Sequence, residues 1–283
     1  MLSKLPNYDI YETNRARSLY ETRTWKSLFD CINNILINNQ NYVHHELSFG
    51  FKKLSFNHLG IPTEDFINKK LNVTDWTIHY VDGFISTYDF AQLVYNKSFP
   101  VNFAIRDFHN IYYSPEPDFA HDVLGHVPML FYEPFQRILL LWAQKTINSK
   151  PLAIDDLYYR CTLEIIKESK KNKKDQMMLK NLEKEFMQIL QELHKSPTNI
   201  WKLGNFFDWS FEFGIIKSAN QVQIFGGAIV TSQNEINSVI KNIDRLKHIT
   251  LDVIQRGISY TQNQKNYYYV SHFNEYEKLL NAI

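Results

Sequence analysis

Residues 114–130 read SPEPDFAHDVLGHVPML, and this stretch decides how the chain is interpreted. Its two histidines, His121 and His126, lie five positions apart, which is about 140° of rotation on an ideal α-helix. They therefore do not share a helix face as residues four apart do. Gly125 is a point where the helix can loosen and let both imidazoles converge. The motif is not the HExxH of zinc proteases, because Asp122 follows His121. Taken alone, two such histidines are more often structural than metal-binding.

A second informative stretch is FFDWSFEFG at residues 206–214, in which Glu212 stands among apolar residues. Burying a lone carboxylate is costly unless a cation or hydrogen bonds compensate it. The simpler interpretations are an exposed Glu212 or a pair with a core Arg or Lys. However, Trp209 and Ile216 place apolar residues on its own helix face. An inward acid and two histidines suggest a 2-His-1-carboxylate face, which leaves open positions on iron(II). No cysteine is placed to complete a closed zinc site.

The composition restricts the remaining choices. The chain has 283 residues, enough for one large domain or two small ones, and a formal charge of +1, which gives no reason to expect nucleic acid or a membrane as partner. Its two cysteines, Cys31 and Cys161, exclude a disulfide framework and fit a reducing compartment. No stretch approaches the ~20 apolar residues of a membrane helix. We therefore expect a cytoplasmic protein.

Hydrophobic periodicity predicts a mainly α fold with small β elements and no βαβ alternation. Residues 1–22 are polar and are expected to wrap the surface. A helix is predicted over 24–39, another over 199–216, and a hairpin-like pair of strands over 250–261 and 266–271. The region from about 150 to 198 is expected to form a helix hairpin packed on the body, with an oligomer contact as the alternative. Its heptad-like pattern is too short for an independent coiled coil.

The run YYSPEPDFAHDVLGHVPML, followed later by WSFEFG, resembles the signature of the pterin-dependent aromatic amino acid hydroxylases. That family contains the phenylalanine, tyrosine and tryptophan hydroxylases. The segments DGFISTYDF (82–90) and IFGGAIVTS (224–232) occur in the family's order. The resemblance covers most of the chain from Thr24 onwards, apart from about 150–198. It implies a single catalytic domain over 1–283 that carries an inserted helical hairpin.

The resemblance also implies roles for individual residues. The iron ligands, which are also the catalytic residues, correspond to His121, His126 and Glu212. Arg106 corresponds to the residue that holds the substrate carboxylate, and the alternative is a surface ion pair with Asp107 or Asp118. The other substrate-binding positions are Ser114, Pro115 and Thr231. The pterin-binding positions are Gly83, Ile85, Thr87, Phe90 and Asp122.

The implied activity is the iron(II)-, tetrahydropterin- and O2-dependent hydroxylation of an aromatic amino acid, with phenylalanine to tyrosine expected. One alternative keeps this chemistry but acts on tryptophan, tyrosine or a specialised aromatic amino acid. The reason for this alternative is Asp208, which stands at a position where the family usually has Trp. Another alternative is a non-catalytic homologue that binds a metal or a partner. A monomer is expected, because neither an N-terminal regulatory domain nor a C-terminal tetramerisation helix is recognisable. An oligomer through 150–198 is the alternative.

Overall fold

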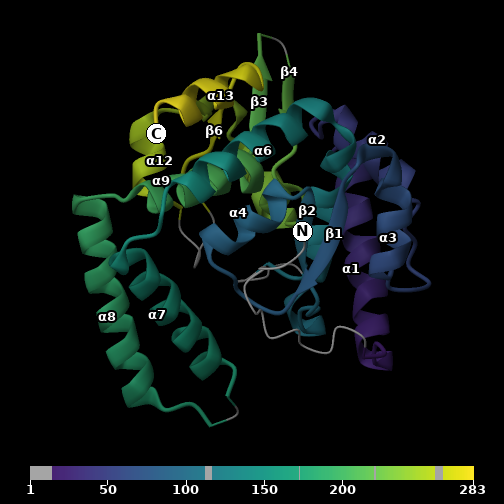
Figure 1. Ribbon diagram of the computed structural model, residues 1–283. Helices are drawn as coiled ribbons and strands as arrows, with labels where there is room; N and C mark the ends of the chain where they lie inside the picture. Colours follow the sequence, from purple (N-terminus) through teal and green to yellow (C-terminus); the bar gives the residue numbers. More distant parts are fainter. Residues whose placement is uncertain (1–14, 112–116, 172, 220, 259–263) are drawn as a thin grey trace.

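The computed structural model describes residues 15–283 except 112–116, 172, 220 and 259–263 (Figure 1). Helices form most of the described chain, and the strands form three separate two-stranded sheets within it. This confirms the predicted class, mainly α with small β elements. Ser114 and Pro115 lie outside the described residues. None of the helices described is both long and apolar enough to cross a bilayer.

Helix α1 (Leu19–Asn38) forms one side of the core. Its apolar residues recur at helical spacing and are buried, among them Trp25, Leu28 and Ile32. The helix begins earlier than the predicted residue 24, because Ser18 caps it and Glu21 closes a capping box. The predicted surface segment 1–22 therefore ends before Leu19, and residues 1–14 lie outside the described part of the chain.

The cap of α1 makes its stability depend on pH. The hydrogen bond from Arg15, together with those from Ser18, lowers the pKa of the Glu21 carboxyl to about 2, although partial burial opposes this. A lowered pKa gives stability that is present above the unfolded value of about 4.3 and lost as the pH falls towards 2. We expect Glu21→Gln to cost about 1 kcal/mol at pH 7 and to approach wild-type stability near pH 2. Urea unfolding across this range measures it, and a difference independent of pH would contradict it.

The next elements build a small βαβ unit on the core, which the sequence pattern did not predict. Strands β1 (Thr77–Val81) and β2 (Ser98–Asn102) pair in parallel, and α4 (Thr87–Tyr95) connects them. The strands have only five residues each, too short for periodicity to reveal the crossover. The helices α2 (His45–Leu54) and α3 (Glu64–Leu71) precede this unit.

The centre of the fold is occupied by α6 (Glu133–Asn148) and α9 (Asn199–Phe207), which lie against each other. The Trp142 indole donates to the Leu203 carbonyl across their contact at 2.8 Å. The short helix α5 (Phe119–His121) is followed by the turns Asp122–His126 and Val127–Phe131, which lead into α6. The buried core therefore lies directly around the two stretches that carry His121 and Glu212.

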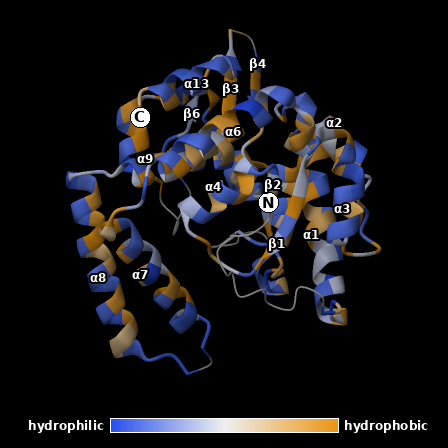
Figure 2. Ribbon diagram, viewed as in Figure 1, coloured by the Kyte–Doolittle hydropathy of each residue, from blue (hydrophilic) through white to orange (hydrophobic). Residues whose placement is uncertain are grey.

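The region predicted as a helix hairpin consists of α7 (Ala153–Ser169) and α8 (Gln176–Lys195), which project from the body in Figure 1. Figure 2 shows apolar residues between the two helices and polar residues at their corner. A separate small cluster holds them together, built on Cys161, Ile189 and Leu193. At the base, Thr198 donates to the Asp155 carboxylate at 2.5 Å, and the rings of Tyr158 and Trp201 meet edge to face.

The C-terminal third differs from expectation in two places. The helix predicted over 199–216 stops at Glu212, because β3 (Ile215–Ser218) must pair with β4 (Gln221–Ile224). The strand pair predicted over 250–261 and 266–271 is wrong. Residues Leu251–Arg256 form α12, whose β-branched Val253 and Ile254 face the core and imitate a strand pattern. The other elements here are α10 (Gly227–Val230), α11 (Gln233–Lys241), β5 (Lys247–His248), which pairs in parallel with β6 (Tyr268–Tyr269), and α13 (Asn274–Asn281).

Candidate metal centre

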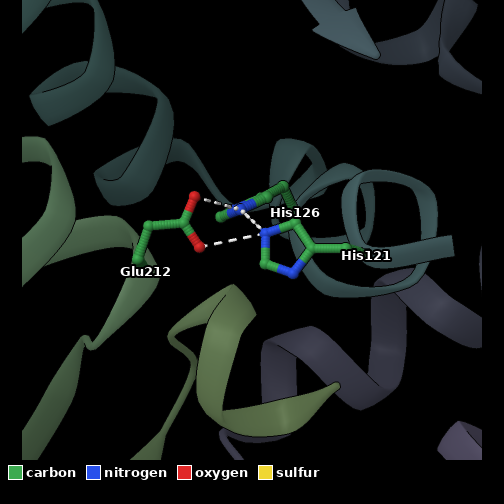
Figure 3. A group of neighbouring side chains, drawn as sticks. All are labelled: His121, His126 and Glu212. Carbon is green, nitrogen blue, oxygen red and sulfur yellow. Dashed lines mark hydrogen bonds and ion pairs between the residues drawn. The ribbon is translucent and has the colours of Figure 1, made fainter. Parts of the chain in front are cut away.

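The three residues proposed as ligands meet at one point, although they come from two distant parts of the chain (Figure 3). The Glu212 carboxylate lies 3.0 Å from Nε2 of His121 and 3.1 Å from Nε2 of His126. The two Nε2 atoms are 3.2 Å apart. Both histidines are buried, and the Glu212 side chain is 14% exposed. The alternatives of an exposed Glu212 or a pair with a core Arg or Lys are therefore wrong.

Two π-turns bring these side chains together. The residues Asp122–His126 form a π-helical turn that follows α5, and the residues Asp208–Glu212 form another that follows α9. A π-turn rotates the chain less per residue than an α-helix, because each hydrogen bond spans five residues instead of four. The five positions from His121 to His126 therefore correspond to much less than 140° of divergence. The loosening expected near Gly125 is present, and His126 and Glu212 each occupy the last position of such a turn.

The geometry of the three donors fits a divalent cation. Bonds of about 2.1 Å at right angles put neighbouring ligand atoms about 3.0 Å apart, which defines one face of an octahedron. The observed separations of 3.0, 3.1 and 3.2 Å match this face. Two imidazoles and one carboxylate on a face leave the opposite positions free, as in iron(II) oxygenases. The residues present therefore fit a metal of this class.

The electrostatics keep the carboxylate ionised. Burial alone would raise the pKa of Glu212, but His126 and His121 hold it well below its usual range. Burial lowers the pKa of His121, and the Glu212 carboxylate more than compensates this and leaves it raised. The site therefore presents a charged acid beside two imidazoles in a buried place. A cation there would neutralise a charge that is otherwise expensive to bury.

The hydroxyl of Thr231 fixes which nitrogen of His121 carries the proton. It donates its single proton to the Gly227 carbonyl at 2.7 Å and lies 3.1 Å from Nδ1 of His121. Because that proton is already used, the Thr231 oxygen must accept from Nδ1–H. With its Nδ1 proton held in this way, His121 is left with Nε2 as the nitrogen that can release its proton and offer a lone pair to a metal. This contact supports a ligand, and the substrate-binding role assigned to Thr231 stays a prediction.

Removing this hydroxyl should weaken metal binding. We expect Thr231→Val to lower metal affinity roughly 10-fold, within the range for partners that orient a ligand, while Thr231→Ser stays near wild type. Competition with a chromophoric chelator measures the affinity. Equal affinity in the Val and Ser variants would show that the His121 tautomer does not depend on this contact.

Two glycines let the backbone approach the ligands closely. A Cβ added at Gly227 would lie 2.4 Å from the His126 ring, and one at Gly125 would lie 3.0 Å from the backbone of Gly227. Ordinary contacts to a Cβ begin near 3.4 Å. The His126 ring therefore rests against bare backbone of α10. Gly227 was missed by the sequence reasoning, although it lies within the IFGGAIVTS segment.

Arg106 forms a buried ion pair with Asp118. Its Nε and Nη2 atoms donate to the two carboxylate oxygens at 3.0 and 2.6 Å, and both side chains are about 95% buried. Burial would raise the pKa of Asp118, but the guanidinium and the hydrogen bonds of the carboxylate hold it lowered. The same carboxylate caps α5 by accepting from the His121 amide at 3.0 Å. The pair that was weighed against a substrate role is thus present, but in the interior. The substrate role of Arg106 stays a prediction.

Two of the residues assigned to the pterin, Phe90 and Asp122, are connected to the ligands. The ring of Phe90 packs on Phe99 and Phe207, and these two rings in turn lie against the His126 ring. Burial raises the pKa of Asp122 to about 6, and its Oδ2 accepts from the Asn102 amide at 2.7 Å.

Asn102 ties this network to the loop at residues 82–86. Its Oδ1 accepts from the Gly83 amide at 2.9 Å, and Gly83 has a φ of +72° that favours glycine. Ile85 lies in the same loop, and Thr87 begins α4 directly after it. Asn102 itself was missed, because nothing in its local sequence distinguishes it.

Asp208 starts the π-turn that ends at Glu212 and is partly buried. It faces the inserted hairpin closely enough that, after burial, its charge contributes to raising the pKa of Tyr158. The α7–α8 hairpin thus brings the side chain of Tyr158 close to Asp208.

Comparison with known proteins agrees with this geometry. Residues 14–144 match the model of the biopterin-dependent aromatic amino acid hydroxylases. The chain is 23% identical over 275 residues to the chloroplastic phenylalanine 4-monooxygenase of Chlamydomonas reinhardtii, covering 93% of this chain and 60% of that one. It is 22% identical over 231 residues to the phenylalanine-4-hydroxylase of Ralstonia nicotianae, covering 81% and 58%.

The chain is thus similar in sequence to the biopterin-dependent aromatic amino acid hydroxylases. Its fold is that of the Chromobacterium violaceum phenylalanine hydroxylase crystallised with bound Fe(III). The TM-score is 0.68 at 22% identity, over 94% of this chain and 79% of that one. The chain spans about 60% of the length of the curated family members named above.

Proposed function

We propose that this chain is an iron(II)- and tetrahydropterin-dependent monooxygenase that hydroxylates phenylalanine to tyrosine. The observation that carries this proposal is the convergence of His121, His126 and Glu212 on one face with ligand spacing. Family relatives named phenylalanine hydroxylases support the substrate. A structure of the Chromobacterium enzyme with iron(III) and 7,8-dihydrobiopterin supports the cofactors.

Iron(II) with the reduced pterin would supply the activation of dioxygen, and the remaining work belongs to the protein. His121, His126 and Glu212 would hold the metal and leave its opposite positions open. Arg106 would hold the substrate carboxylate, and its orientation is fixed by Asp118. The aromatic wall around Phe90 would exclude water from the reacting atoms.

The substrate alternatives remain the other aromatic amino acids, and Asp208 is the reason to keep a specialised substrate among them. A non-catalytic homologue is the less supported function, since all three ligand positions are intact and converge. We also propose that the chain works as a monomer in the cytoplasm. Sedimentation analysis of the intact protein tests the first of these two points.

The test is an anaerobic titration with iron(II), followed by oxygen and tetrahydropterin with each of the three aromatic amino acids in turn. Mass spectrometry of the products identifies the substrate and the number of oxygen atoms added. We expect one oxygen atom in phenylalanine and no product when either iron or pterin is omitted. Tight iron binding with no product from any aromatic amino acid would overturn the proposal.

A further inference from the structure

We propose that the inserted α7–α8 hairpin positions the pterin-binding loop, residues 82–86, through Tyr159. The inference rests on the proposed function, because it assumes that this loop meets the pterin. Tyr159 belongs to α7, inside the region of about 150–198 that the family resemblance does not cover.

The contact between Tyr159 and the loop has two parts. The Tyr159 hydroxyl donates to the Phe84 carbonyl at 3.3 Å, and the two rings pack with centroids 5.7 Å apart. Phe84 stands between Gly83 and Ile85, two of the residues assigned to the pterin. A side chain from the hairpin thus holds the backbone of the loop at its middle.

The loop needs such support, because it has no regular secondary structure between β1 and α4. At one end, the Gly83 amide is held by Asn102, which also contacts Asp122 beside the ligand His121. At the other end, Ser86 caps α4. Tyr159 anchors the loop between these two ends. Unlike Asn102 and Ser86, it lies outside the βαβ unit.

The attachment of the hairpin to the body allows it to position the loop. Its base is attached to α9 by the Thr198–Asp155 hydrogen bond and the Tyr158–Trp201 ring contact. Helix α9 continues directly into the π-turn that ends at Glu212. The hairpin therefore links the segment that carries a metal ligand to the loop on the pterin side, and Tyr159 makes the second of these contacts.

The test compares Tyr159→Phe and Tyr159→Ala in the full chain. Hydrogen–deuterium exchange of residues 83–87, measured without pterin, reads the loop directly. Calorimetric titration of the iron-loaded protein with tetrahydropterin under anaerobic conditions reads the affinity. We expect Tyr159→Phe to weaken pterin binding about threefold, as for a lost neutral hydrogen bond, and Tyr159→Ala about tenfold. Both variants should exchange faster at the loop.

Controls separate this role from general damage. Met187→Ala, on the exposed side of α8, should leave both measurements unchanged. Asn102→Ala, which removes the acceptor of the Gly83 amide, should speed exchange in the same loop. Tyr159→Phe keeps the ring packing and removes only the hydroxyl. It therefore tests the inference even if Tyr159→Ala unfolds the hairpin.

Unchanged loop exchange in both Tyr159 variants, or faster exchange with unaltered pterin affinity, would overturn the inference. If the wild-type protein binds no tetrahydropterin, the proposed function is wrong. The part of the inference that concerns pterin binding is then wrong as well. The exchange data by themselves then decide whether Tyr159 anchors the loop.

Discussion

Glu212→Gln should lose metal binding by at least about 100-fold and with it all hydroxylase activity, because a ligand contributes no less than the partners that orient it. The amide keeps the size of the side chain but lacks the charge that the two imidazoles and a cation require. The donor atoms lie 3.0 and 3.1 Å from the histidine nitrogens, so the substitution changes the site directly. Iron content after dialysis and chelator competition measure the loss.

The matched control is Glu235→Gln. Glu235 is also a buried glutamate, on α11, where the Tyr267 hydroxyl donates to it away from the metal centre. This variant should bind iron as the wild type does, whatever its effect on stability. Iron retained by Glu212→Gln would contradict the assignment of Glu212 as a ligand.

Asp118→Ala should destabilise the protein by about 3–5 kcal/mol, because it leaves the Arg106 guanidinium buried without its partner. It also removes the cap of α5 at the His121 amide, so metal binding should weaken as well. Urea unfolding measures the first effect, and chelator competition measures the second.

The double variant Arg106→Met/Asp118→Leu separates stability from substrate recognition. Replacing a buried ion pair by apolar residues often restores stability, so the double variant should unfold near the wild-type urea concentration. If Arg106 holds the substrate carboxylate, the amino acid KM should nevertheless rise by at least about 10-fold. An unchanged KM would show that Arg106 serves the fold alone.

The sequence predicted the convergence of three side chains better than it predicted the local structure that brings them together. His121, His126 and Glu212 could be named because a buried acid and two histidines suit one kind of ion. The π-turns that bring them together have no reliable sequence signal, since Gly125 permits one without requiring it. Asp118 was weighed only as a partner of Arg106, and its second role as the cap of α5 depends on tertiary structure.

Elements whose form depends on distant partners were predicted least well. The segment from Leu251 to Arg256 has β-branched residues, yet it is a helix because packing in the core outweighs local preference. The βαβ unit depends on the pairing of Thr77 with Ser98, which no local pattern shows. Asn102 and Tyr159 act through contacts across the fold, and their neighbours in sequence do not reveal them.

The close approach of Gly227 to the His126 ring has a consequence for variation in the gene. Gly227→Ala introduces one methyl group, no charge and no new hydrogen bond, but that methyl would stand 2.4 Å from a ring that must stay in place. A missense change at this codon should therefore inactivate the protein while leaving it folded, with iron affinity as the measured defect. We therefore expect position 227 to tolerate no side chain larger than the hydrogen atom of glycine.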